Sequence, residues 1–310
     1  MGLATREAYG KALVELGEIN ENIVVLDADL SKSTKTADFK NKFPERFINA
    51  GIAEQNLLGM SAGLSRYGKV PFASTFAVFA TGRAFEIIRN SICYPNMNVK
   101  IAATHAGITV GEDGGSHQSI EDIAIMNSLP NMSVLVPADA RETNEIIKYA
   151  AEHVGPVYIR LGRLNSEDLF DETYKFEYGK GVVVKEGSDC TIISTGLMSA
   201  MAKDACEELE KENISVRLVH MPTIKPIDRE IIKKAATETK FILTCEEHSV
   251  VGGLGQIVAS VTSETVPTKV VKLGINDVFG QSATPNELLN EYGLTKENII
   301  KIIKENMVNK

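Results

Sequence analysis

The 310-residue sequence predicts two α/β domains, each built on a mostly parallel β-sheet. Short β-branched runs alternate with amphipathic stretches along the chain, which is the pattern of strands joined by helices. The strand runs are continuously apolar, as expected of strands that are buried on both faces of a parallel sheet. At roughly 150 residues per domain, the length provides for two hydrophobic cores.

We place the first domain at residues 1–165, on the first series of alternating elements. A helix is expected over 6–19, a strand over 22–30 and a Gly/Ala-rich helix over 51–68. The later elements are, in chain order, strand 70–76, helix 81–93 and strands 99–107, 133–139 and 156–163.

An acidic, irregular stretch over 165–181 interrupts the alternation, and we place an interdomain linker at 166–185. The second domain, at 186–310, then resumes the pattern. Its expected elements are strand 190–196, a helix ending at Leu209, strand 214–220, helix 228–238, strand 240–248, helix 252–261 and strand 269–274.

Composition and charge exclude several classes of protein. Hydrophobic residues make up 44% of the chain and charged residues 24%, which is globular composition and not that of a disordered tail or a coiled coil. The formal net charge is -8, and no basic stripe with interleaved aromatics occurs, so nucleic acid is not an expected partner. No apolar run approaches the roughly 18 residues of a membrane span. The four cysteines are far apart, which favours a reducing, cytoplasmic location.

Glu54 is the most informative single residue. It is the only charged residue between Phe47 and Ser65, and its neighbours are mostly small or apolar. If such a carboxylate is buried, its pKa rises, which suits a group that shares or transfers a proton near neutral pH. The alternative is a glutamate that only stabilises the start of a helix.

A second cluster lies in the segment THAGITVGEDGGSHQSIED, directly after a predicted strand. It holds His105, Glu112, Asp113 and His117 in a loop with four glycines. Open α/β sheets build their sites at the carboxyl ends of parallel strands. The alternatives are a structural glycine-rich turn and a metal-dependent hydrolase that uses the two histidines. Their spacing matches no common zinc motif, and we expect no metal ligands in this chain.

Arginines and phenylalanines add further candidates. Arg160 and Arg163 end a predicted strand, and Arg6 lies near the amino terminus; guanidinium groups commonly hold phosphate esters. Each could equally form a surface ion pair. Ser33 could donate to the same phosphate or cap its turn. A further pair, Phe76 and Phe79, could be core residues or could stack on a heteroaromatic ring.

Several blocks resemble a known family. GIAEQNLLGMSAGL, STFAVFATGRAFEIIRNSICYPNMNVK, ATHAGITVGEDGGSHQSIEDIA and PNMSVLVPAD are similar to the pyrimidine-binding domain of transketolases and related thiamine diphosphate enzymes. TIISTG and EEHSVVGGLG are similar to the transketolase C-terminal domain. Transketolases also have an amino-terminal domain that holds the diphosphate through Mg²⁺ with a Gly-Asp-Gly sequence, which this chain lacks. The resemblance therefore implies the C-terminal subunit of a split transketolase, whose partner chain binds the diphosphate and Mg²⁺.

The resemblance also assigns roles to individual residues. Glu54 matches the glutamate that hydrogen-bonds N1′ of the cofactor's aminopyrimidine and so promotes ionisation at C2. Phe79, with Phe76 beside it, matches the ring-stacking phenylalanine, and Asp29 matches a carboxylate near the cofactor. His117 and Asp113 match residues that contact sugar hydroxyls, with His117 a proton-transfer partner. The positions expected near the substrate phosphate are Arg6, Ser33, His105 and Arg163, with Arg160 as an additional candidate.

Together these matches imply transfer of a two-carbon ketol unit between sugar phosphates by an α2β2 assembly. The chain has THAG, DGGSHQS and Gly82 where many transketolases have THDS, DGPTHQP and a tyrosine, which leaves the donor and acceptor sugars open. The alternatives are a split deoxyxylulose-phosphate synthase, the β subunit of a 2-oxo acid dehydrogenase complex, and a non-catalytic regulatory subunit.

Overall fold

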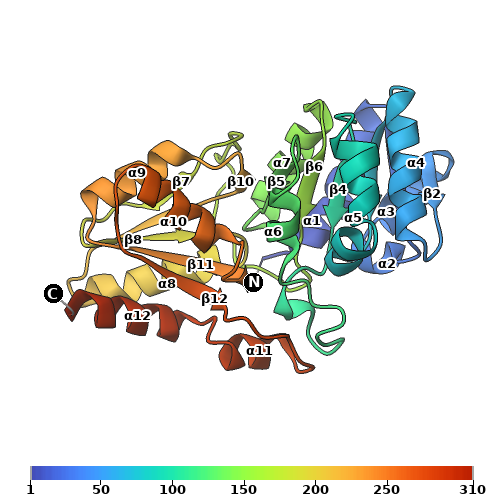
Figure 1. Ribbon diagram of the computed structural model, residues 1–310. Coiled ribbons are helices and arrows are strands. Elements are labelled where there is room, and N and C mark those ends of the chain that lie inside the picture. Colours follow the sequence, from blue (N-terminus) through green and yellow to red (C-terminus); the bar gives the residue numbers. More distant parts are fainter. Residues whose placement is uncertain (1, 309–310) are drawn as a thin grey trace.

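The computed structural model describes residues 2–308 and contains two β-sheets, each flanked by helices (Figure 1). The elements of the first half are α1 (Thr5–Ile19), β1 (Ile23–Asp27), α2 (Ser31–Thr34), α3 (Ala37–Lys42), η1 (Pro44–Arg46), β2 (Phe47–Asn49), α4 (Glu54–Arg66), β3 (Val70–Ser74), η2 (Phe79–Arg83), α5 (Phe85–Ile87), η3 (Ile88–Cys93), β4 (Lys100–Ala103), η4 (Ile108–Val110), α6 (Asp122–Asn127), β5 (Ser133–Leu135), α7 (Ala140–Glu152) and β6 (Val157–Arg160).

The elements of the second half are β7 (Val182–Lys185), β8 (Cys190–Ser194), α8 (Met198–Lys211), β9 (Val216–His220), β10 (Thr223–Lys225), α9 (Arg229–Glu238), β11 (Ile242–Ser249), α10 (Leu254–Glu264), β12 (Val270–Ile275), α11 (Pro285–Glu291) and α12 (Lys296–Val308). None of the helices in the described chain is long and apolar enough to cross a membrane.

The first sheet has the strand order β10-β5-β6-β4-β3-β1-β2, and every pairing is parallel except that of β10. The strands β1, β4 and β6 are buried throughout, and since successive side chains point to opposite sides, each of them contributes to both faces of the sheet. On β1, Ile23 and Val25 pack with α1 and α7, whereas Val24 and Leu26 pack with α4. The continuous apolar run of this strand therefore serves two helical layers at once.

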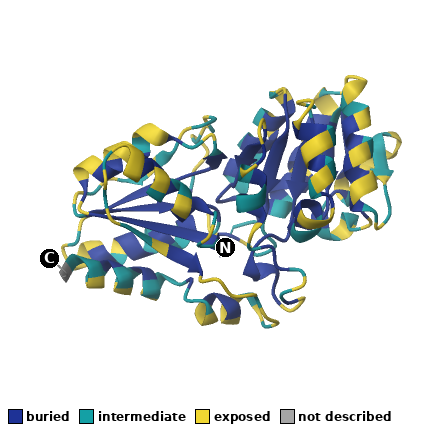
Figure 2. Ribbon diagram, viewed as in Figure 1, coloured by how far each residue is buried: buried dark blue, intermediate teal, exposed yellow. Residues whose placement is uncertain are grey.

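The second sheet has the order β12-β11-β8-β9-β7 and is parallel except at β7. Its central strands again supply both faces: Ile192 packs with α8 and α12, and Ile193 packs with α9 and α10. Figure 2 shows the result, with buried strands inside and helices whose outer faces are exposed. The two mostly parallel sheets confirm the predicted fold class.

Three segments differ from the sequence-based expectation. Residues 182–185, which we placed in the linker, form β7, because this β-branched run pairs antiparallel with β9. The expected helix over 81–93 consists of two π-helical segments, η2 and η3, that flank the short α5. Finally, β10 lies in the second half of the chain but pairs with β5 at the edge of the first sheet, with Thr223 opposite Leu135.

Lys100, on β4, is a fully buried lysine. Its ammonium donates to Asn98 Oδ1 at 2.6 Å and to the carbonyl oxygens of His153 and Gly155 at 2.6 and 2.8 Å. All three acceptors are uncharged, and burial lowers the pKa of Lys100 to about 7. The folded protein therefore releases this proton at a lower pH than the unfolded chain does.

This difference makes a prediction about stability. Between pH 7.5 and 9.5 the unfolded chain holds the Lys100 proton and the folded protein does not, so stability rises with pH. We expect the wild type to gain about 2 kcal/mol of unfolding free energy relative to Lys100→Met over this interval. Urea unfolding at both pH values measures it, with the exposed Lys269→Met as control. Parallel pH dependence of wild type and Lys100→Met would contradict the assignment.

Candidate functional site

Two of the predicted residues meet where β3 and β4 end. The backbone of Phe76 pairs with Thr104 just beyond these strands, and His105 follows with a φ of 58°. The imidazole of His105 stacks on the ring of Phe76, with the ring centroids 3.9 Å apart. Both side chains are buried, so the carboxyl ends of these strands present a flat, partly polar wall.

Phe79 and His117 extend this wall towards solvent. Phe79 stacks on Phe76 at 5.9 Å, and His117 lies edge-on to Phe79 at 5.3 Å. His117 is partly buried, and its Nδ1 lies 2.9 Å from Ser116 Oγ. The fold thus gathers both predicted phenylalanines and both loop histidines into one cluster, although 12 positions separate the histidines in the sequence.

Arg6 and Ser33 lie beside His105. Arg6 Nη1 donates to Ser33 O at 3.0 Å and lies 3.2 Å from His105 Nε2. Burial, and then the positive charge of Arg6, lower the pKa of His105 to about 3, so its imidazole is neutral. Since an arginine can only donate, Nε2 is the acceptor, and Nδ1 carries the proton that faces Thr104 Oγ1 at 2.8 Å. Arg6 Nε is buried without a hydrogen-bond partner in the described chain.

Glu54 is the first residue of α4, and its side chain is only 6% exposed. Its Oε1 accepts a hydrogen bond of 3.0 Å from Nη1 of Arg83, a residue that the sequence analysis did not select. The Arg83 guanidinium also lies over the ring of Phe79, 4.2 Å from its centroid. A buried carboxylate and an aromatic face are therefore linked by one planar cation.

The π-helical turn η2 explains why sequence periodicity missed Arg83. In this turn the helix is locally wider than an α-helix, and Phe79 and Arg83 are its first and last residues. Hydrophobic periodicity is evaluated at 3.6 residues per turn, so it does not detect a wider turn of this kind. The sequence indicated Arg83 only through its position in the segment STFAVFATGRAF, which also contains Phe79.

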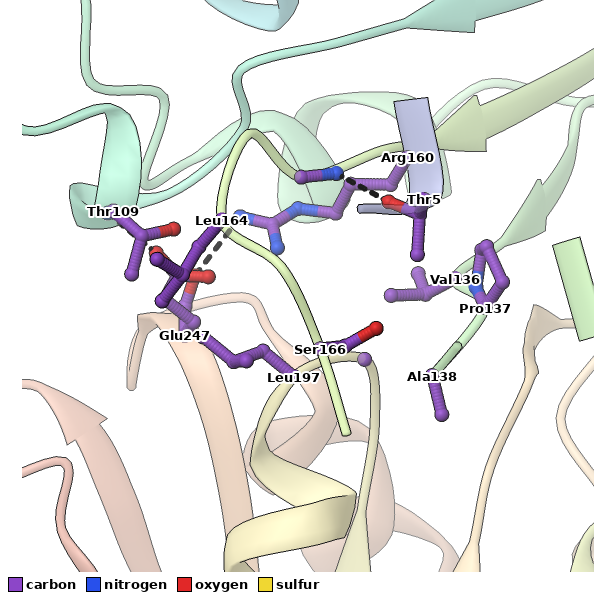
Figure 3. A pocket seen from close by; sticks show the side chains of 12 residues that line it. Thr5, Thr109, Val136, Pro137, Ala138, Arg160, Leu164, Ser166, Leu197 and Glu247 are labelled. Carbon is purple, nitrogen blue, oxygen red and sulfur yellow. Dashed lines mark hydrogen bonds between the residues drawn. The ribbon is translucent and has the colours of Figure 1, made fainter. Parts of the chain in front are cut away.

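The structure places Arg160 away from this cluster. The side chain is only 7% exposed; its Nε donates to Asp122 Oδ2 at 2.8 Å and its Nη2 to Glu247 O at 2.9 Å. Figure 3 shows Arg160 and Glu247 lining a pocket between the two domains, with Thr109 nearby. Two of the guanidinium nitrogens are thus engaged within the protein, and the role of Arg160 near a substrate phosphate stays a prediction.

The remaining candidates lie at the margins. Arg163 Nη1 lies 3.5 Å from Glu112 Oε2 and 3.8 Å from Asp113 Oδ2, and both of these acids are exposed on the glycine-rich loop. Asp29 is exposed after β1, where its Oδ1 accepts a hydrogen bond of 2.9 Å from Asn49 Nδ2. These placements leave the roles assigned to Arg163, Asp113 and Asp29 as predictions.

The second domain supports the glycine-rich loop through Glu247 and Gln281. Glu247 Oε1, on β11, accepts from Thr109 N at 2.7 Å, and burial raises the pKa of this carboxyl. On the loop itself, Gln118 Nε2 donates to Ile108 O at 3.2 Å and to Gln281 O at 2.9 Å. No local sequence pattern indicates these contacts, because the partners lie far apart in the chain.

Gly107 is a point of close approach between the loop and the second domain. Its φ is 82°, and a Cβ built at this position would lie 2.2 Å from Glu247 Oε1. A side chain here would therefore meet both an unfavourable backbone conformation and a buried carboxylate. Only glycine fits this passage of the loop.

Glu54 and Phe79 fit the aminopyrimidine ring of thiamine diphosphate, the cofactor that the family resemblance implies. A cavity lined by Ala53, Glu54, Gln55, Asn56 and Arg83 opens beside the half-buried ring of Phe79. A buried carboxylate can hold a ring nitrogen while an aromatic face stacks on the ring. Among residues 2–308, no group of three or more His, Cys, Asp or Glu side chains is arranged to hold a metal ion.

Two known domain families match this chain, one in each half. Residues 1–167 match the transketolase pyrimidine-binding domain, and residues 179–299 match the transketolase C-terminal domain. A protein of Methanocaldococcus jannaschii described as a transketolase C-terminal section is 54% identical over 305 residues, which cover 97% of this chain and 96% of that protein.

Two further relatives come from divided enzymes. In Phocaeicola vulgatus, one of the subunits of an apulose-4-phosphate transketolase is 37% identical over 98% of this chain and 97% of its own length. A solved structure described as a split-gene transketolase in an inactive β4 tetramer has 61% identity and a TM-score of 0.92, with 98% of both chains covered.

The close approach at Gly107 makes a prediction about the loop. Gly107→Ala should lower the unfolding free energy by more than about 2 kcal/mol, because a Cβ at positive φ would also collide with the Glu247 carboxylate. Gly59→Ala is the matched control, since a Cβ at this helical position meets no atom within 4 Å. Thermal unfolding compares the two variants, and equal melting temperatures would show that the loop does not rest on Glu247.

Proposed function

This chain belongs to the transketolase family, and we propose that it is the C-terminal subunit of a split transketolase that transfers a two-carbon ketol unit between sugar phosphates. The observation that carries the proposal is the pairing of Glu54 with Phe79. The Glu54 carboxylate is 6% exposed and lines the same cavity as Arg83. The guanidinium of Arg83 in turn stacks on the half-buried ring of Phe79. Such a pair suits a flat nitrogen heterocycle and has no evident purpose in the core.

We propose that thiamine diphosphate binds between this chain and a partner. The partner would be an N-terminal subunit that holds the diphosphate together with Mg²⁺, in an α2β2 assembly. Two observations support this: relatives of nearly the same length are described as a section and a subunit of transketolases, and the β4 tetramer of a split-gene transketolase is described as inactive. The cytoplasmic location expected from the widely spaced cysteines is part of the same proposal.

Each residue of the site then has a task. When bound, thiamine diphosphate supplies a carbon that becomes nucleophilic after losing its proton. Glu54 would hold a proton at N1′ of the aminopyrimidine, inside a site that excludes water and so strengthens the hydrogen bond. Phe79 would fix the plane of the ring by stacking. His117, edge-on to Phe79, would contact the sugar hydroxyls and exchange a proton at the carbonyl oxygen.

The phosphate of the substrate would lie near Arg6. The Nε of Arg6 is a buried donor, and because His105 beside it is neutral, the local positive charges are those of Arg6 and Arg163. Ser33, which already anchors Arg6 through its carbonyl, and Arg163 would complete this region. Asp113, next to Arg163, would contact a sugar hydroxyl. The sugars themselves stay open, because a related protein is described as part of an apulose-4-phosphate transketolase.

Reconstitution tests the proposal. We expect the purified chain to lack ketol transfer, and expect transfer to appear when an N-terminal transketolase subunit, thiamine diphosphate and Mg²⁺ are added. Xylulose and ribose phosphates are the substrates, and chromatography of the sugar products is the measurement. Release of carbon dioxide from pyruvate with glyceraldehyde phosphate would instead favour a synthase or a 2-oxo acid enzyme. Full activity of the chain alone would overturn the split arrangement.

The Glu54→Gln variant tests whether Glu54 holds a proton at N1′ of the aminopyrimidine. The amide keeps the shape of the side chain but cannot take up the proton, so kcat should fall about 100-fold or more. Isothermal titration should still detect thiamine diphosphate binding to the assembled variant, which separates lost chemistry from lost folding. Glu86→Gln, at an exposed glutamate of α5, is the control. Near-normal turnover in Glu54→Gln would refute the role of this carboxylate.

A further inference from the structure

Arg83 makes the two contacts that the proposed function reserves for the cofactor ring. We infer that Arg83 is an internal occupant of the aminopyrimidine site, and that its side chain must leave Glu54 before the cofactor can bind. The inference rests on the proposed function of Glu54 and Phe79. It adds a competition between a side chain of this protein and its cofactor.

The geometry carries the inference. Nη1 of Arg83 lies 3.0 Å from Glu54 Oε1, while the centre of the guanidinium lies 4.2 Å from the centroid of Phe79. A guanidinium is flat, donates hydrogen bonds in its plane and stacks on aromatic faces. An aminopyrimidine held by the same two residues needs the same edge of the carboxylate and the same face of the ring. Both groups cannot occupy this space together.

The exposure of the two partners shows which one can move. The Glu54 side chain is 6% exposed, whereas that of Arg83 is 54% exposed and reaches the site from the solvent side. Gln55 Nε2 donates to Arg83 O at 3.1 Å, so the backbone of Arg83 is held by α4. Rotation of the long side chain alone would therefore open the site, without movement of the π-helical turn.

In the cofactor-free chain, Arg83 stabilises the buried Glu54 carboxylate electrostatically. A buried carboxylate without a partner is costly, because it loses its hydration and gains nothing in return. In the cofactor-free chain, Arg83 provides the positive charge and the hydrogen bond that Glu54 needs. When the ring arrives, it replaces both contacts, and the guanidinium returns to water at little cost because it is already half exposed.

The experiment compares two arginine variants of the assembled complex with its N-terminal partner. Isothermal titration with thiamine diphosphate at saturating Mg²⁺ gives the dissociation constant. We expect Arg83→Ala to bind about three- to tenfold more tightly than the wild type, because no internal competitor remains. Arg83→Gln, which removes the charge and keeps much of the side chain, should shift in the same direction. Arg89→Ala, an exposed arginine paired with Asn90, should bind like the wild type.

The outcomes are distinguishable. Unchanged or weaker binding in both Arg83 variants would overturn the inference, because Arg83 would then stay in place or help to hold the ring. The proposed function would survive that result, since the wild type still binds. Failure of the wild-type complex to bind thiamine diphosphate would overturn both. Thermal unfolding of the isolated chain gives a second readout: Arg83→Ala should lower the melting temperature more than Arg89→Ala does, and equal values would contradict the role of Arg83 in stabilising Glu54.

Discussion

The buried ion pair between Arg160 and Asp122 is the constraint on which the arrangement of the site depends. Arg160 ends the strand β6 and contacts three elements: Asp122 on α6, the carbonyl of Ser119 after the glycine-rich loop, and the carbonyl of Glu247 on β11. Tyr158 OH donates to the same Asp122 oxygen at 2.7 Å. Removing one member of such a pair typically costs about 3–5 kcal/mol, because the other charge stays buried and uncompensated. The pair therefore fixes the first sheet, the loop and the second domain relative to one another.

The parts of the molecule that could be predicted from sequence are those in which the signal is local. Continuous apolar strands between amphipathic helices indicated the fold class, since each strand has to bury both faces. Glu54 could be selected because no other charge surrounds it in the chain, and the loop of His105 and His117 because it follows a strand at the edge where sites form. In each case the deciding observation concerns residues that are close together in the chain.

The parts that could not be predicted depend on distant partners. The partners of Arg160 lie 38, 41 and 87 positions away, so no local pattern in the sequence could indicate that this arginine is buried and paired. Arg83 meets Glu54 across 29 positions and through a π-helical turn that hydrophobic periodicity does not detect. The strand β10 has only three residues and pairs with β5, in the other half of the chain. Tertiary packing, and not local propensity, decides all three.

The strand β10 has a consequence for how this protein can be divided. Because Thr223–Lys225 completes the edge of the first sheet, and Lys225 Nζ donates to the carbonyl oxygens of Asn127 and Leu129, the second half of the chain forms part of the first domain's sheet. A protease nick in the linker would leave two fragments that stay associated. A gene encoding these two domains could not be cut between them without exposing an unpaired β-edge on one product, a surface prone to aggregation.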